Sequence, residues 1–438
     1  MVRILRSFIF VLCFINFLQA AGVDVAVYGL TEEGKIYYRK EKEWVLLDDT
    51  TQWAHIAAGA HGQLYGITHV PYRADEDTNK DYPTAADIEK WPTLLDGGDI
   101  SLRLGVSVEN PMGTSWIKMP SRKLTYGRLD HFIGVAAGQN RVIACTVPKY
   151  RDVLIRFDPF AGDVNANAVA PWQEIKGTAY AVAVDPVQDT SFIVDDWQKW
   201  AGGNTYSAVI GHIYSRPYRA SGWRNISPYC EGHVTMDNIN RLDQYVGEEG
   251  WGKTLHVCAI NSNIIQIAAG NNTLLGIGKN GSIFVNTDPA NDKYTSLDPA
   301  PIRLPALYSM VSQSRPFIAA GVRNDGANEI WLVQRQTIQI IQQQNQLYYE
   351  GQTTKTASQG FVTGRNLETA SFVFRRKGTE INNKTGFGWE LMYSSIDTTP
   401  EQKFIFKEIA IGSFNPPKAP TIKDIMQNFF KALPNKPK

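Results

Sequence analysis

Four oxygen-bearing side chains alternate along one segment with the spacing of cation ligands. They are Asp75, Asp77, Asn79 and Asp81. An EF-hand loop places its first ligands at alternate positions in the same way, with Gly at its sixth position and Glu at its twelfth. Here those two positions hold Lys80 and Ala86. Half of the EF-hand template is therefore present, and on that basis the pattern predicts calcium binding. The alternative interpretation is a solvated acidic loop.

Seven large aromatic side chains lie in inserts or turns of the sequence, where a ligand has access to them. Ligand pockets combine aromatic walls with a few polar groups, and for a sugar the rings would stack while Asn or Asp bonds the hydroxyls. The seven residues are Tyr72, Tyr82, Trp91, Trp197, Trp200, Tyr245 and Trp251. We predict these residues as the ligand-binding set.

Catalytic motifs are weak in this chain. No His-Glu-x-x-His occurs, and no Ser stands in Gly-x-Ser-x-Gly. A glycan hydrolase needs a pair of carboxylates. Asp185, Asp195 and Asp196 could meet near one mouth of a central channel, although no pattern pairs them. We therefore expect a protein that is not an enzyme, with a hydrolase as the third alternative.

The elements that must position these side chains come from a repeated unit. The tetrad Ile/Val-Ala-Ala-Gly occurs four times, and a turn and a short apolar strand follow each copy. The copies begin at Ile56, Val135, Ile267 and Ile318. From Tyr28 to Tyr65 one unit spans 65 − 28 = 37 residues, close to the ~40 residues of a four-stranded propeller blade. The sequence predicts an all-β fold, a β-propeller with long loop insertions.

Six units can be counted along the chain, so we predict six blades. The sixth unit starts at Ile330–Val333 and continues at Ile338–Gln342. The first unit lacks a leading strand, which either Ser371–Arg375 or Phe404–Ile411 would supply to close the ring. Seven blades is the alternative, because residues 371–411 hold enough strand-like sequence for another blade.

The small residues of the tetrad predict the innermost strand of each blade. Ala side chains fit the crowding where blades converge, and Gly is expected to open the turn that follows. A Trp leads the outer strand of four units: Trp44, Trp116, Trp172 and Trp223. Because large aromatic side chains dominate core energetics, we predict that these four fill the gaps between blades.

Both ends of the chain differ from the repeats. Residues 1–20 have the pattern of a secretory signal, with Arg3 and Arg6 before an apolar run. The repeats occupy residues 22–412, and residues 413–438 hold a Pro-rich linker and a short amphipathic helix. That helix either docks on its own propeller or binds a partner. We predict a protein that is secreted, periplasmic or at the cell surface, with no transmembrane segment.

Charge and cysteine content narrow the choice of partners. Removal of the signal takes away two basic residues, so the net charge changes from +1 to +1 − 2 = −1. A near-neutral chain has no field that gathers nucleic acid.

Cys145 lies in an apolar strand, where a buried thiol is expected. Cys230 and Cys258 flank an insertion, and spacing alone leaves open whether they form a disulfide.

The order of these motifs resembles the tectonin family of β-propellers, the relatives of tachylectin-1 and fish-egg lectin. The matching segments are Ile36-Tyr37-Tyr38-Arg39, Trp44-Val45-Leu46-Leu47, His55-Ile56-Ala57-Ala58-Gly59 and Leu64-Tyr65-Gly66-Ile67. The resemblance covers residues 24–350 in broken form. The inserts at 68–99 and 227–252 and the tail after residue 351 depart from it.

This resemblance implies a lectin-like protein that recognises carbohydrate or lipopolysaccharide on cell surfaces. It implies no cofactor, with calcium left open by the acidic segment at Asp75–Asp81. The alternative is a protein-interaction scaffold that uses a propeller face and the C-terminal helix. Loops on a rigid scaffold carry function in either case.

Overall fold

The structure, a computed structural model, describes most of the repeat region. The described residues are 24–70, 97–121, 131–146, 152–157, 172–196, 200–201, 204–205, 211–218, 220, 222–226, 264–278, 281–290, 294–305, 308–314, 316–340, 367–399 and 402–416. Every named element in these ranges is a β-strand. None of these ranges contains a helix of the length and apolar character that would cross a membrane.

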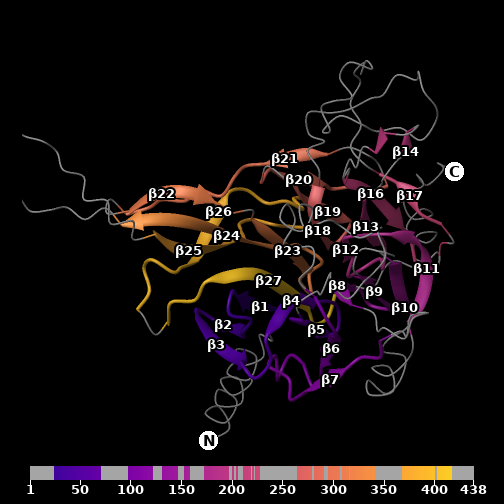
Figure 1. Cartoon of the computed structure of the whole chain (residues 1–438), viewed down its shortest axis with the longest axis horizontal. Helices are drawn as coiled ribbons and strands as arrows, with labels where there is room; N and C mark the ends of the chain where they lie inside the picture. Colours follow the sequence, from indigo (N-terminus) through magenta and orange to yellow (C-terminus); the bar gives the residue numbers. More distant parts are fainter. Residues whose placement is uncertain are drawn as a thin grey trace, which may run out of the picture.

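Five sheets are antiparallel and four-stranded, and their strands lie one outside the other from the centre of the molecule (Figure 1). The first blade has the order β27 (Phe406–Ser413), β1 (Val25–Thr31), β2 (Ile36–Lys40) and β3 (Glu43–Asp48). The second has β4 (Trp53–Ala58), β5 (Leu64–Thr68), β6 (Ile100–Arg103) and β7 (Trp116–Lys118). The third has β8 (Phe132–Ala137), β9 (Arg141–Thr146), β10 (Asp152–Phe157) and β11 (Gln173–Thr178).

The fourth and fifth blades follow the same plan. The fourth has β12 (Ala181–Val184), β13 (Ser191–Asp196), β16 (Gly211–Arg216) and β17 (Arg224–Asn225). The fifth has β18 (Ile264–Gly270), β19 (Thr273–Gly278), β20 (Ile283–Asn286) and β21 (Thr295–Leu297). A separate two-stranded ribbon holds β14 (Trp200–Ala201) and β15 (Asn204–Thr205).

The remaining strands form a five-stranded sheet, called the sixth sheet here. Its members are β22 (Tyr308–Gln313), β23 (Phe317–Val322), β24 (Asn328–Ile340), β25 (Leu367–Arg376) and β26 (Trp389–Ser394). One half of β24 pairs with β23 and the other half with β22, while β25 runs along its opposite side. The outer half of β24 and its partner β22 therefore project from the ring as an arm (Figure 1).

The predicted blade count is corrected by this sheet. The sequence predicts six like blades, but the regular four-stranded blades number five, and the sixth repeat forms a five-stranded sheet. The stretch 334–337, Gln-Arg-Gln-Thr, has none of the Gly, Pro or Asn residues that break strands. Ile330–Val333 and Ile338–Ile340 therefore belong to one long strand instead of two. The seven-blade alternative is wrong, because β25 and β26 complete the sixth sheet and β27 joins the first blade.

The inner edge strands form a ring around the centre. These strands are β27, β4, β8, β12, β18 and β23, and each packs against its neighbours in that order. All four tetrads lie in this ring, in β4, β8, β18 and β23, and their predicted position is confirmed. The ring closes because β27 pairs antiparallel with β1, from Val25 opposite Ser413 to Thr31 opposite Phe406. Of the two segments predicted to close the ring, the later one does so. The all-β propeller prediction is thus confirmed.

The glycines of the tetrads have a different role from the one expected. None of them has a positive φ, so no left-handed turn requires them. Instead, each lies against the next unit of the ring, where there is no room for a side chain. A Cβ at Gly59 would lie 2.6 Å from the Cβ of Ala137. At Gly321 it would meet Ile411, and at Gly270 it would meet Asn328. Close approach of neighbouring blades therefore selects glycine here.

The repeated Trp residues pack as predicted. Trp172 is buried, and its ring centroid lies 5.6 Å from that of Phe132. Trp44 packs at 4.5 Å from Phe406, and Trp116 packs at 4.5 Å from Trp53. Trp223 packs half-buried against a core cluster. Each of the four Trp side chains also belongs to a core cluster that holds residues of a neighbouring unit, so the prediction that they fill the gaps between blades is confirmed.

Candidate binding face

The turns that follow the inner strands gather at one end of the ring, and we call this end the inner-turn face. A hydrogen bond crosses each joint between neighbouring units there. At the first joint, the backbone N–H of Ser413 donates to the carbonyl of Gly59 at 2.9 Å. At the second, Nε2 of Gln63 donates to the carbonyl of Gly138 at 2.8 Å. These bonds tie the closing strand to the second blade and the second blade to the third.

Two buried aspartates tie the fourth blade to its neighbours. The backbone N–H of Asn140, from the third blade, donates to Oδ1 of Asp189 at 3.0 Å. The backbone N–H of Asn272, from the fifth blade, donates to Oδ2 of Asp185 at 2.7 Å. Burial raises the pKa of Asp185 to about 6, although three backbone N–H groups oppose that rise. Burial also raises the pKa of Asp189 above its ordinary value.

The last two joints close the circle. The backbone N–H of Asn271 donates to Oδ1 of Asn328 in the sixth sheet at 2.7 Å, and Nδ2 of Asn271 donates to the carbonyl of Gly326 at 2.9 Å. The backbone N–H of Val322 donates to Oγ of Ser413 at 2.8 Å. With this last bond, hydrogen bonds run without a gap around the inner-turn face, and they fix the relative positions of the units.

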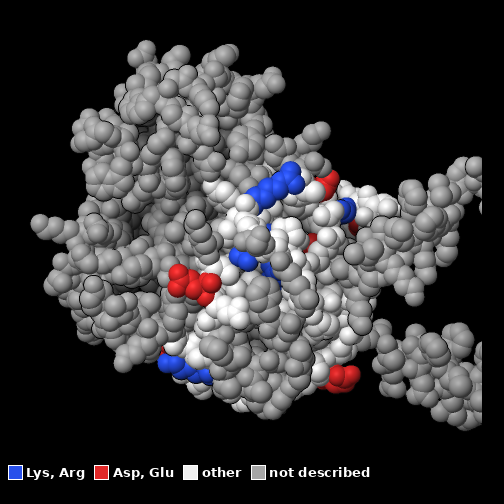
Figure 2. Space-filling model, turned by 90° about the vertical axis from the view of Figure 1, so that its right-hand side faces the viewer, with Lys and Arg blue, Asp and Glu red and all other residues white. Residues whose placement is uncertain are grey.

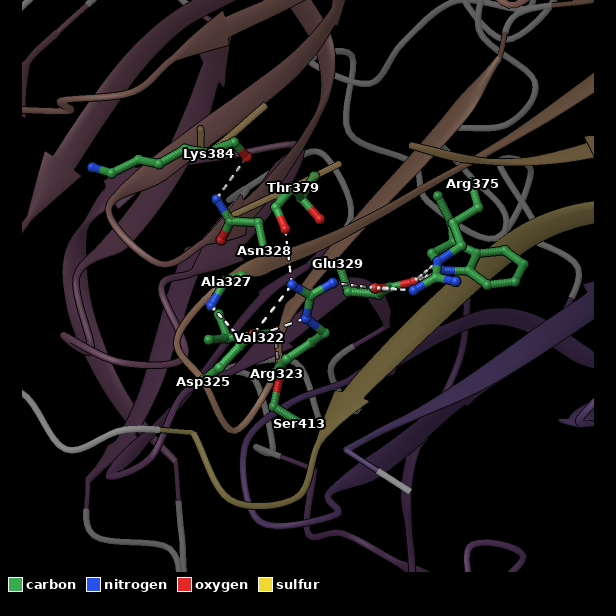
Figure 3. A network of polar contacts seen from close by, with 11 residues as sticks. Val322, Arg323, Asp325, Ala327, Asn328, Glu329, Arg375, Thr379, Lys384 and Ser413 are labelled. Carbon is green, nitrogen blue, oxygen red and sulfur yellow. Dashed lines mark hydrogen bonds and ion pairs between the residues drawn. The ribbon is translucent and has the colours of Figure 1, made fainter. Parts of the chain in front are cut away.

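Residues 377–388 form the loop between β25 and β26, and this loop is anchored on the inner-turn face (Figure 3). Nη2 of Arg323 donates to the carbonyl of Thr379 at 2.8 Å. Nδ2 of Asn328 donates to the carbonyl of Lys384 at 3.1 Å, and Nζ of Lys384 donates to the carbonyl of Asn272 at 3.3 Å. The loop is therefore fixed to both the fifth blade and the sixth sheet.

The anchored loop exposes two large apolar side chains. Phe387 is 65% exposed and Ile381 is 60% exposed. Gly378 has φ of 64°, and a Cβ there would lie 2.6 Å from Cδ1 of Phe387. The ring of Phe387 therefore rests on the backbone of Gly378, which holds it in place while its outer face stays open to a partner.

A buried carboxylate organises the base of this loop. Glu329, 2% exposed, accepts hydrogen bonds from Nε of Arg375 at 2.5 Å and from Nε1 of Trp331 at 2.8 Å. Nη1 of Arg323 lies 3.8 Å from its Oε2. Figure 3 shows the Arg323 guanidinium between Glu329, Thr379 and Asp325. The hydrogen bond with Glu329 raises the pKa of Arg375 above its ordinary value.

Exposed apolar side chains concentrate on the sixth sheet and its loop. Eight large apolar residues of the described chain are exposed, and six of them lie between residues 310 and 391. The six are Met310, Val311, Leu367, Ile381, Phe387 and Leu391. They do not form a single patch: Met310 and Val311 lie on β22, whereas Ile381 and Phe387 lie on the anchored loop.

A cavity of about 250 Å³ also lies on the sixth sheet. Ile338, Ala370 and Ile396 give it apolar walls. Lys403 and Glu368, both about 40% exposed, form an ion pair of 2.8 Å at its lining. Its volume lies just below the roughly 300–1,000 Å³ of typical ligand pockets.

Described side chains of both signs lie on the side of the molecule opposite the arm. Figure 2 shows basic and acidic side chains interspersed over the described residues of that side.

Most residues of the predicted ligand set lie outside the described residues. This holds for Tyr72, Tyr82, Trp91, Trp197, Tyr245 and Trp251, and for the predicted calcium ligands Asp75, Asp77, Asn79 and Asp81. Trp200 lies in β14, where its backbone pairs with Thr205. Among the residues that the structure does describe, no three His, Cys, Asp or Glu side chains gather to hold a metal ion.

The three aspartates considered for hydrolysis do not meet at one mouth of the channel. Asp185 follows β12 at the inner-turn face, beside the start of β13 at Ser191. Asp195 and Asp196 lie at the opposite end of β13, opposite His212 and Gly211. Five residues of strand, about 16 Å at roughly 3.3 Å each, separate these ends. The antiparallel hairpin therefore places Asp185 at one end of the fourth blade and the backbones of Asp195 and Asp196 at the other.

Cys145 is buried and free, as expected, and burial raises the pKa of its thiol to about 12. Cys230, Cys258 and the predicted C-terminal helix lie outside the described residues. β27 runs to Ser413, and Phe414 still packs in the core. The thiol of Cys145 is thus a small apolar group of the third blade, not a nucleophile.

The sequence interpretation missed the loop at residues 377–388. Its signal is a cluster of turn residues, Gly378, Gly386 and Gly388, all with positive φ. The same stretch lies between two strand-like segments, which favoured another blade. In the sequence, Phe387 stands between Gly386 and Gly388, and a large apolar residue within such a turn indicates an exposed side chain.

Comparisons with known proteins give no family for this chain. The sequence matches no protein-family model and no curated protein. Solved structures that resemble it include YCF48 from Cyanidioschyzon merolae, at 10% identity, a TM-score of 0.35 and coverage of 82% of this chain and 89% of that one. YCF48 bound to D1 peptide has 10% identity, a TM-score of 0.32 and coverage of 72% and 74%. Human WBSCR16 has 12% identity, a TM-score of 0.30 and coverage of 70% and 73%.

Proposed function

We propose that this protein is a non-catalytic binding scaffold that holds a protein partner on its inner-turn face, at the loop of residues 377–388. The observation that carries the proposal is the exposed pair Ile381 and Phe387 on an anchored loop. Binding hot spots are often aromatic side chains surrounded by polar groups. Here the surrounding polar residues include Lys377, Glu380 and Asn383.

Rigidity supports the same proposal. A loop that is already ordered loses little conformational entropy on binding, so its contacts contribute more to affinity. The hydrogen bonds of Arg323, Asn328 and Lys384 hold this loop before any partner arrives. The signal-like residues 1–20 lead us to propose that the partner is met outside the cytoplasm.

Site-specific photo-crosslinking in the source cells tests the proposal. A photoreactive residue in place of Phe387 is expected to capture one dominant protein, and Ile381→Ala in the same chain is expected to weaken that capture. The matched control places the same residue at Leu46, an exposed apolar position on β3 of the first blade. Equal capture from both positions, or none at position 387, would refute the proposal.

Carbohydrate recognition is the second candidate function. It is favoured by the aromatic residues of the inserts and by the resemblance of the repeats to tectonins. In this case a glycan and lipopolysaccharide array is expected to show saturable binding to a defined sugar, lost on Trp91→Ala or Trp200→Ala. Loss of binding with a chelator would assign Asp75–Asp81 as a calcium site. A blank array with folded protein would reject this candidate and leave the protein scaffold.

A further inference from the structure

β22 leaves one of its edges without a described partner strand. It pairs with β24 from Tyr308 opposite Ile340 to Gln313 opposite Gln336. No described strand pairs with its other side. Met310 and Val311 are 55% and 51% exposed, and Ser312 and Gln313 are exposed as well. A strand in this state presents backbone N–H and C=O groups that a further strand can pair with.

The other outermost strands are protected from such pairing in ways that β22 is not. Charged residues on an edge strand, or a very short strand, discourage pairing with another chain. β3, β7, β11, β17 and β26 each carry at least one charged residue, and β21 has only three residues. β22 has six residues, Tyr-Ser-Met-Val-Ser-Gln, and no charge or proline. The one protective device that β22 does have is the bulge between Met310 and Ser312, which carries the exposed Val311.

We propose that β22 pairs antiparallel with β22 of a second copy of this chain, across a two-fold axis. A two-fold axis places the same strand on both sides of the joint, and two copies of one strand related in this way run antiparallel. β22 carries no charge that would attract a strand of opposite charge. A second, equally uncharged β22 can pair with it without electrostatic repulsion. The two sixth sheets then join into one continuous sheet.

β22 lies on the arm, away from the inner strands of the ring. β22 and the outer half of β24 project beyond the ring (Figure 1). A joint at the arm keeps the bodies of the two propellers apart. It also leaves Phe387 of each copy free, since the loop of residues 377–388 lies on the inner-turn face. The pairing is therefore independent of the proposed protein partner.

Sedimentation over about a hundredfold range of concentration tests this pairing. The full chain is expected to change reversibly from monomer to dimer. Val311→Lys is expected to weaken the dimer at least about tenfold, because two like charges would meet at the new joint. Leu46→Lys, which places the same charge on the edge of the first blade, is the matched control and should leave the dimer unchanged.

A second measurement identifies the contact itself. With Val311→Cys, oxidation is expected to yield a dimer whose cross-linked peptides join position 311 to position 311, and Leu46→Cys should not cross-link in this way. A monomer at every concentration would overturn the proposal. A dimer that Val311→Lys leaves intact and Phe387→Ala dissolves would also overturn it, since the copies would then meet through the inner-turn face. Unchanged thermal unfolding of the variants excludes a loss of folding.

Discussion

Glu329 shows how one buried side chain supports the candidate face. Its carboxylate accepts hydrogen bonds from Arg375 and Trp331 and lies close to Arg323, which in turn holds the loop at Thr379. A buried carboxylate with such partners fixes their orientation. Loss of this charge would therefore affect both the stability of the sixth sheet and the position of the loop.

We predict that Glu329→Gln lowers the free energy of unfolding by about 2–3 kcal/mol, less than a fully buried pair would give because Arg375 is partly exposed. Denaturant unfolding measures the change. The matched control is Glu368→Gln, whose partner Lys403 is exposed. That change should cost no more than about 1 kcal/mol. Equal losses in the two variants would contradict the role given to Glu329.

Asp185 predicts an unusual dependence of stability on pH. Burial raises the pKa of its carboxyl from 3.8 to about 6, so the folded chain binds this proton more tightly than the unfolded chain does. The contribution of Asp185 to stability is present at pH below 3.8 and falls as pH rises from 3.8 to about 6. The loss is of the order of 3 kcal/mol, at about 1.4 kcal/mol for each pH unit.

Comparison with Asp185→Asn isolates this effect. Unfolding free energies of both chains are measured from about pH 3.5 to 7, and the wild type is expected to lose stability relative to the variant as pH rises. The pair His55 and Glu408 acts in the opposite sense. Burial alone would raise the pKa of Glu408, but the charge and hydrogen bond of His55 hold that pKa below its ordinary value. The contribution of Glu408 to stability is therefore lost as pH falls below 4.5. Both chains share that pair, and parallel curves would refute the prediction for Asp185.

The inner strands depend on small residues where they touch. Gly59→Ala is predicted to destabilise the ring by about 1–3 kcal/mol, because its new Cβ would overlap the Cβ and the carbonyl of Ala137. Gly412 in β27 provides a matched control, since a Cβ there makes only ordinary contacts, the nearest at 3.6 Å. Gly412→Ala should stay within about 0.5 kcal/mol of the wild type. Thermal unfolding of the two variants would show whether the restriction is specific to the joint.

The elements that recur could be predicted from the sequence, and the ones that depart from the repeat could not. Tetrad and Trp-led strands are set by local spacing and composition, so β4, β8, β18 and β23 were found. The lack of strand breakers at 334–337 allows one long β24, but the pairing of its outer half with β22, which precedes β23 in the chain, has no local signal. Likewise, the loop of residues 377–388 is fixed by Arg323 and Asn328, some 50 residues earlier. Such long-range partners leave no periodic trace in a sequence.

At the scale of the whole molecule, we expect closure of the ring to make unfolding cooperative. The first blade is incomplete until β27 returns from the end of the described chain to pair with β1. The same strand donates from Ser413 to Gly59 and accepts from Val322, and thus joins the second blade to the sixth sheet. Ile409 and Ile411 of β27 are buried in the adjoining core. One strand therefore completes a blade, a core cluster and the circle of hydrogen bonds.

We predict that a chain ending at residue 403 does not unfold in a single sharp thermal transition, because β1 would present an open edge and two joints of the ring would be lost. A chain ending at residue 416 retains all six inner strands and is expected to unfold as sharply as the full chain. Circular dichroism and calorimetry of the three chains make the comparison. Cooperative unfolding of the chain ending at 403 would show that the other units hold together without closure. Loss of cooperativity in the chain ending at 416 would show that the ring depends on residues beyond β27.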